Sequence, residues 1–107
     1  MKYKVFFHAG DELVLKTRVS RGEAWLDSEG LHVRGNQEIL IPKSQIIEAE
    51  LFRLHGLGRV IRLEHREGRM FLSVVRLMIG QFAFINFFKT GKLCKELSDI
   101  ANHSATL

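Results

Sequence analysis

The chain has few residues that cross-link or stiffen a small fold: its 107 residues include one cysteine, Cys94, and one proline, Pro42. A single cysteine excludes a disulfide within the chain and indicates a reducing compartment, so we expect a cytoplasmic protein. The five histidines are scattered and lack the spacing of a structural zinc site. We therefore expect a fold held by its hydrophobic core, with no metal and no other cofactor.

A long uninterrupted hydrophobic run is also missing. The most apolar window, Phe71–Phe88, is interrupted by Arg76, Gln81 and Asn86, whereas a membrane-spanning helix needs about twenty apolar residues in a row. The apolar run near the N-terminus is too short for a signal peptide. We interpret the window as core. With 46% apolar and 26% charged residues, the chain has the composition of one globular domain over residues 1–107.

Signatures of catalysis are equally scarce. No glycine-rich phosphate loop precedes a helix, and no serine or cysteine nucleophile has a local signature with a base. The acidic pairs Asp11/Glu12 and Glu48/Glu50 fall where a turn and a solvent-facing strand are expected. We therefore do not expect an enzyme.

The chain does contain many short runs with the period of two that is typical of strands. Two of them, Arg59–Arg66 and Arg69–Leu77, flank Glu67-Gly68 and predict a hairpin, because glycine takes a positive φ at little cost. The second run is apolar at both parities, as a central strand would be. This hairpin is expected to form the centre of the fold.

Other runs predict further strands around this hairpin. The segment Asp27–Gly30 predicts a tight turn, and Pro42, which lacks a backbone donor, marks a strand end or edge. In Ile46–Leu54, the residues Ile47, Ala49 and Leu51 are expected to form one apolar row. The other predicted strands are Lys2–His8, Glu12–Val19, Glu23–Leu26, Leu31–Arg34, Glu38–Ile41 and Gln81–Phe88.

The periodicity changes at the C-terminus. Leu93, Leu97, Ile100 and Ala101 fall at i, i+4, i+7 and i+8, which predicts an amphipathic helix over Thr90–Asn102 that docks on the sheet. Thr90 is a candidate N-cap, because its hydroxyl can accept a hydrogen bond from a free backbone donor. Cys94 lies beside the apolar stripe and is expected to be a small buried hydrophobe.

Several segments together resemble pleckstrin-homology-like domains, in particular the bacterial and GRAM-like forms. They are GEAWLDSEGLHVRG at Gly22–Gly35, IPKSQIIEAELFRL at Ile41–Leu54, GRMFLSVVRL at Gly68–Leu77, and the final helix. The resemblance implies a mainly β fold, a bent antiparallel sheet or partly open barrel capped by one C-terminal α-helix. It also implies a non-catalytic binding or assembly module, in which basic loops can hold an anionic lipid headgroup.

The basic residues suggest where such a ligand would bind. The excess positive charge of +4 lies between Arg53 and Arg76, a segment that contains six arginines and two glutamates. Loops carry ligands more often than strand faces do, so the first candidate site is Arg53, His55 and Arg59 around the loop His55–Gly58. The second candidate is the cluster Lys16, Arg18 and Arg21. A simpler interpretation is that alternating arginines keep a sheet edge soluble and unpaired.

Alternative functions and partners follow from the same residues. The Arg-rich hairpin has the charge and one aromatic side chain, Phe71, of a nucleic-acid surface, but the other phenylalanines look like core, so we rank nucleic acid below a membrane or protein partner. Arg18, Arg21 and the turn Asp27–Gly30 faintly resemble the cyclic-dinucleotide pattern of PilZ domains, with shorter spacings. An open sheet edge would also allow self-association.

Overall fold

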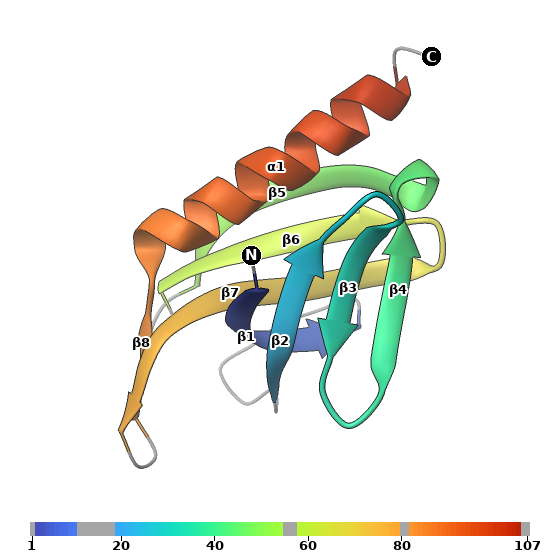
Figure 1. The fold of residues 1–107 in the computed structure, drawn as a ribbon. Coiled ribbons are helices and arrows are strands. Elements are labelled where there is room, and N and C mark those ends of the chain that lie inside the picture. The colour runs from blue at the N-terminus through green and yellow to red at the C-terminus, as the bar shows by residue number, and fades with distance from the viewer. Residues whose placement is uncertain (1, 11–18, 55–57, 80–81, 106–107) are drawn as a thin grey trace.

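The computed structural model describes residues 2–10, 19–54, 58–79 and 82–105, which form a curled antiparallel sheet and one long helix (Figure 1). The strands are β1 (Lys2–Ala9), β2 (Ser20–Leu26), β3 (Gly30–Arg34), β4 (Glu38–Pro42), β5 (Ile46–Leu54), β6 (Gly58–His65), β7 (Gly68–Ile79) and β8 (Phe82–Ile85). A short 3-10 helix, η1 (Lys43–Gln45), follows β4, and α1 spans Phe87–Ala105.

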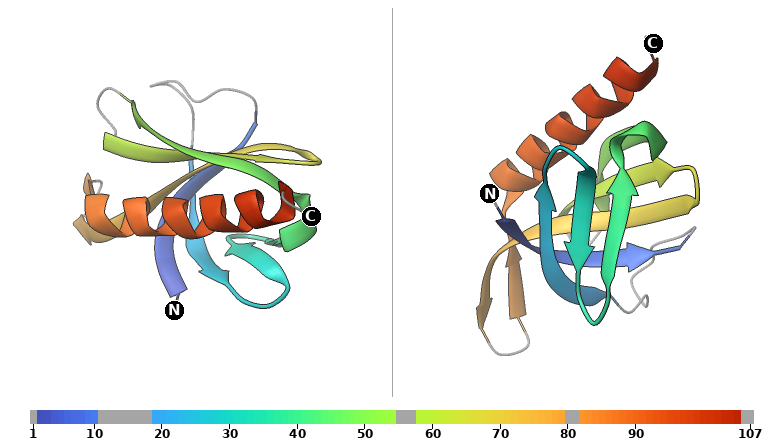
Figure 2. Two further views of the ribbon diagram at one scale, coloured as in Figure 1. Left: turned by 90° about the horizontal axis from the view of Figure 1, so that it is seen from above. Right: turned by 45° about the vertical axis from the view of Figure 1, so that its right-hand side comes forward.

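The strand order in the sheet is β4-β3-β2-β1-β7-β6-β5, and β8 pairs with β7 outside this path. The sheet bends into a partly open barrel, and α1 covers the opening on the side of β5 (Figure 2). The predicted fold class, mainly β with one C-terminal capping helix, is confirmed.

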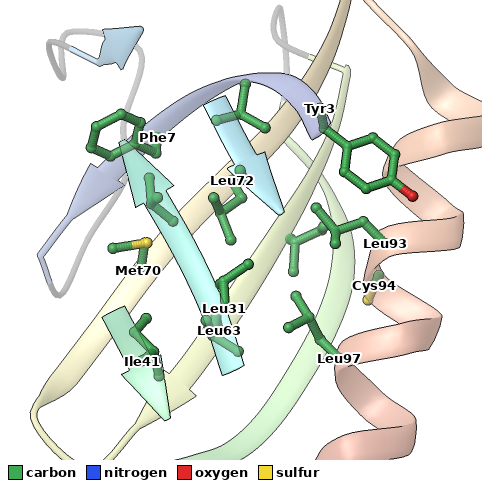
Figure 3. Packing of buried hydrophobic residues seen from close by; sticks show 14 of the residues in the cluster. Tyr3, Phe7, Leu31, Ile41, Leu63, Met70, Leu72, Leu93, Cys94 and Leu97 are labelled. Carbon is green, nitrogen blue, oxygen red and sulfur yellow. The ribbon is translucent and has the colours of Figure 1, made fainter. Parts of the chain in front are cut away.

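The core lies between the inner face of the sheet and the helix. Tyr3, Val5 and Phe7 alternate inward from β1, and Leu93 and Leu97 point toward them from α1 (Figure 3). Each fully buried side chain of this size contributes about 1.5–3 kcal/mol before entropy is counted. The predicted helical stripe is confirmed, and Cys94 is buried beside it with 6% of its surface exposed.

The central hairpin forms as predicted, with a shifted turn. β6 and β7 pair as far as His65 and Gly68, so the two turn residues are Arg66 and Glu67. Gly68, at φ 145°, opens β7 instead of closing the turn. β7 lies between β1 and β6 in the sheet and is buried on both faces between Met70 and Val75, which confirms its central place.

The first hairpin, β2–β3, turns where the sequence predicted. The Asp27 carboxylate accepts hydrogen bonds from the backbone N–H groups of Glu29 and Gly30. Gly30 has φ 148°, and a Cβ there would lie 2.1 Å from the carbonyl oxygen of Ile41. No other residue type fits this position, because both the conformation and the space favour glycine.

The predicted apolar row of β5 is wrong at its first member. The pairing of β5 with β6 is irregular between Ile46 and Glu48, which indicates a bulge. As a result Ile46 is buried in the core, with 2% of its surface exposed, whereas Ile47 is 58% exposed. Ala49 packs against the core as expected, but Leu51 is partly exposed.

The helix begins three residues earlier than predicted. β8 ends at Ile85, and Phe87 and Phe88 belong to α1 and not to a strand. Asn86 caps the helix by accepting a hydrogen bond from the backbone N–H of Lys89 at 3.0 Å, so the prediction of Thr90 as N-cap is wrong. The predicted strand Glu12–Val19 falls almost entirely on residues 11–18, outside the described residues.

Candidate functional site

The first candidate site brings two arginines together. Arg53 and Arg59 lie directly opposite each other where β5 and β6 approach their loop. Arg59 has the same parity as Ile61 and Leu63, which point into the core, so it lies on the face that α1 covers. Its guanidinium is close to Gly91 in α1, since a Cβ on Gly91 would lie 3.3 Å from Arg59 Nη1. The pair therefore borders the N-terminal part of the helix.

The second candidate site does not join the first. Arg21 pairs with Phe6 on β1 and has the parity of the outer face, because its neighbours Gly22 and Ala24 have the inward parity and Ala24 is fully buried. It is two strands away from β7 and on the opposite face from Arg59. Lys16, Arg18 and His55 lie outside the described residues.

The remaining arginines of the central hairpin are largely neutralised. Arg62 forms an ion pair with Glu50 and lies 3.7 Å from Glu64, and the Arg69 Nε donates to Glu64 at 2.5 Å. The interpretation that these arginines protect a sheet edge is wrong, because β6 lies between β5 and β7. Their acidic partners leave this face with little excess charge for a polyanion.

A basic hollow that the sequence did not indicate lies at the start of α1. It has a volume of about 450 Å³ and is lined by Lys2, Tyr3, Lys4, Val74, Val75, Asn86 and Lys89. Three lysines therefore line one hollow, and none of the described residues that line it is acidic. Two carboxylates lie beside lining residues: Glu96 accepts a hydrogen bond from the Tyr3 hydroxyl at 3.5 Å, and Glu23 lies opposite Lys4 in the β1–β2 pairing.

The electrostatics of this end of the molecule favour an anion. The first turn of α1 contains no acidic residue, so nothing in that turn offsets the positive end of the helix dipole. Lys89 adds a further positive charge there, and Arg59 approaches the next turn at Gly91. We call the set Lys2, Lys4, Lys89, Arg53 and Arg59 the basic end.

The buried polar contacts at the base of the helix hold the basic end in place. Thr90 is fully buried, and its Oγ1 accepts a hydrogen bond from the backbone N–H of Val74 at 3.0 Å while donating to the Asn86 carbonyl at 2.7 Å. The backbone N–H of Asn86 donates to the Val74 carbonyl at 2.8 Å. These bonds fix the first turn of α1 against β7, and thereby fix Lys89 relative to β1.

Sequence reasoning missed the hollow because its residues are far apart in the chain. Lys2 and Lys4 share one face of β1 by alternation, which the sequence shows. Their approach to Lys89 depends on the antiparallel pairing of β1 with β7, in which Val5 lies opposite Val74. No local signal encodes this long-range pairing.

A second polar cluster lies on the outer face of β2 and β3. The rings of Trp25 and His32 stack with 4.9 Å between centroids and 4° between planes, and the Lys2 ammonium lies 4.7 Å from the Trp25 ring. His32 Nε2 is 2.8 Å from Asp27 Oδ2, and its Nδ1 is 3.4 Å from Glu38 Oε1. Burial lowers the pKa of His32, but the carboxylates of Asp27, Glu38 and Glu29 outweigh it and raise the pKa above its ordinary value.

A second hollow, of about 280 Å³, is lined by Ala9, Gly10, His65, Glu67, Gly68 and Arg69, so an acidic side chain shares it. A small apolar pocket of about 30 Å³ lies beside Phe6, Phe71 and Ile85. Among the described residues, no group of three histidine, cysteine, aspartate or glutamate side chains could hold a metal ion. None of the described helices is long and apolar enough to cross a membrane.

In comparisons with known proteins, no family model, curated protein or solved structure matches this chain.

Proposed function

We propose that this chain is a non-catalytic binding module of the pleckstrin-homology-like kind, and that its ligand carries phosphate groups. The bent antiparallel sheet and its C-terminal helix are the architecture that the sequence resemblance implies. The proposal for the ligand is supported by one observation: Lys2, Lys4 and Lys89 line one hollow, and none of its lining residues in the described part of the chain is acidic.

The contrast with other cations on the surface supports this choice of site. Arg34, Arg62 and Arg69 each contact a glutamate, as expected where charge serves solubility and local structure. Lys2, Lys4 and Lys89 instead line one hollow, and the Lys2 ammonium also lies 4.7 Å from the Trp25 ring. Ammonium groups are compact point charges with three donors each, which suits the several oxygens of a phosphate group. Arg53 and Arg59 extend the same basic end and would contact a larger ligand.

The direct test is a titration with inorganic pyrophosphate, followed by calorimetry and by amide chemical shifts at low salt. We expect the variant carrying Lys4→Ala and Lys89→Ala to bind about tenfold or more weakly, because a hydrogen bond to a charged group contributes about 1.5–3 kcal/mol. Lys2 is retained in this variant because it also contacts Trp25.

The matched control removes the same charge elsewhere. Lys43 and Lys95 are exposed and do not line the hollow, so the variant carrying Lys43→Ala and Lys95→Ala should bind like the wild type. A third variant, with Arg53→Ala and Arg59→Ala, tests whether the arginine pair belongs to the same binding site as the lysines. Equal weakening by the hollow variant and by its control would show that only net charge matters and would overturn the proposed site.

A further inference from the structure

The Lys2 side chain has neighbours on both sides of β1. It lines the basic hollow together with Lys4 and Lys89, but its ammonium lies 4.7 Å from the centre of the Trp25 ring. In the sheet, β1 lies between β2 and β7. Trp25 belongs to β2 and does not line the hollow, whereas Val74 and Lys89 line it from β7 and from α1. The ammonium therefore rests on the side of β1 that faces away from β7 and α1.

The Trp25 ring is fixed in a position that suits a cation. Trp25 lies opposite Lys2 in the pairing of β1 with β2, and opposite His32 in the pairing of β2 with β3. His32 stacks on the ring and is itself held by Asp27 and Glu38. Because β1 and β3 flank β2, Lys2 and His32 approach the ring from opposite sides. Indole is the aromatic group that attracts a cation most strongly, so the ring holds the Lys2 ammonium where the structure shows it.

A ligand in the hollow would compete with the ring for this ammonium. A cation–π contact at an exposed site is weaker than a hydrogen bond between charged groups, so a phosphate group would draw the ammonium away from the indole. The flexible four-carbon side chain of lysine allows this change without movement of the backbone. A second cation, the Arg34 guanidinium, lies 5.4 Å from the centre of the ring. It is paired with Glu23 and does not line the hollow. Of these two cations, only Lys2 reaches both the ring and the hollow.

We propose that Trp25 is a positioning residue for the phosphate site: its ring holds the Lys2 ammonium away from the hollow in the free protein and releases it to the phosphate on binding. This inference rests on the proposed function, because it concerns the same hollow. It adds that one of the three lysines changes its partner on binding, and that a residue outside the hollow lowers the affinity of the site.

The release can be measured in the wild type by NMR during a titration with inorganic pyrophosphate. Protons above the face of an aromatic ring resonate upfield, so we expect the terminal methylene protons of Lys2 to be shifted upfield in the free protein. They should return to ordinary lysine values at saturation, with the Kd that calorimetry gives. The resonances of Lys43, which is exposed and does not line the hollow, should stay unchanged. This measurement requires no substitution, so a variant that fails to fold cannot obscure it.

Substitutions at both positions test whether the ring acts through the lysine. We expect Trp25→Leu to bind pyrophosphate about two- to fivefold more tightly, the factor that corresponds to one exposed cation–π contact. Trp25→Phe retains a weaker cation acceptor and should lie between Trp25→Leu and the wild type. Lys2→Met removes the ammonium from a side chain of similar shape and should weaken binding about threefold or more. In the Lys2→Met background, Trp25→Leu should leave the affinity unchanged.

The outcomes distinguish a failure of the release from a failure of the site. Pyrophosphate binding that depends on Lys4 and Lys89, while the Lys2 resonances do not move, would overturn the release and leave the phosphate site standing. Weaker binding by Trp25→Leu with an intact melting curve would also overturn the release. Tightening by Trp25→Leu that persists in the Lys2→Met background would show that the ring does not act through Lys2. A wild type that binds no pyrophosphate would overturn the site and the release together.

Discussion

At the scale of single residues, Thr90 and His32 connect distant parts of the fold in ways that the sequence did not predict. Thr90 satisfies the backbone N–H of Val74 at the point where β7 leaves its pairing with β1. An unsatisfied donor at such a buried site would cost about 1–3 kcal/mol. His32 connects the turn at Asp27 with β4 through Glu38. Sequence reasoning identified the turn and both strands, but not the side chains that join them.

His32 makes the stability of the protein depend on pH. Its pKa in the folded protein lies above the ordinary value of 6.5, so its stabilising contribution is complete below about pH 6.5 and is lost as the pH rises through the folded pKa. The pKa of Asp27 is lowered, first by the hydrogen bond from the backbone of Glu29 and also by His32. Its contribution is present above the ordinary value of 3.8 and is lost as the pH falls through the lower folded value.

We therefore expect this cluster to stabilise the fold most between these two limits. The free energy of unfolding in urea, measured from about pH 5 to about pH 8.5, should decrease toward the alkaline end in the wild type. The decrease should be smaller in His32→Gln. An identical slope in His32→Gln and the wild type would contradict the assignment.

At the scale of elements, periodicity predicted most of the architecture. The alternation of apolar and polar residues predicted β1, the β6–β7 hairpin and the central position of β7. The helical stripe predicted that Leu93 and Leu97 are buried. The prediction from alternation failed where a local irregularity changes which alternate residues of a strand face the core. The bulge at Ile47 places Ile46 in the core and Ile47 in solvent, and an apolar run without charges continued from β8 into α1. Neither the bulge nor the strand-to-helix change alters the apolar pattern, so the sequence could not show them.

The bulge and the position of the helix can be tested together by shortening two side chains to alanine. Leu97 is fully buried under α1, so Leu97→Ala should lower the free energy of unfolding by about 2–5 kcal/mol. Ile47 is 58% exposed, so Ile47→Ala should change it by less than about 0.5 kcal/mol. Urea unfolding of both variants provides the comparison. A large loss in Ile47→Ala would restore the simple alternation of β5 and remove the bulge.

At the scale of the whole molecule, the candidate site illustrates what a sequence can and cannot show. The arginines that stood out as a run, such as Arg62 and Arg69, are paired with glutamates on neighbouring strands. The lysines that line the hollow come from the first strand and from α1, so Lys89 is far from Lys2 and Lys4 in the sequence. Arg53 and Arg59 were correctly expected to be close, because a short loop joins their strands. Charge density along a chain is therefore a weaker guide than the pairing of strands across a sheet.

The two edges of the sheet differ in how well they are protected. β5 is bulged at Ile47 and lies beneath α1, where the Ser98 hydroxyl donates to the Ala49 carbonyl at 2.9 Å. β4 pairs regularly with β3 along its whole length, ends at Pro42 as predicted, and presents Leu40 with 42% of its surface exposed. A regular edge strand with an exposed apolar side chain is open to pairing with a second copy.

We therefore expect self-association through β4, and the prediction that the chain forms oligomers is tested at this edge. Light scattering over a wide concentration range should show a mass that rises with concentration in the wild type. Leu40→Lys places a charge on the edge, which natural sheets use to block pairing, and should keep the protein monomeric. Ile47→Lys places the same charge on the protected edge and should leave association unchanged. A monomer at every concentration would exclude edge pairing, and association blocked only by Ile47→Lys would move the interface to β5.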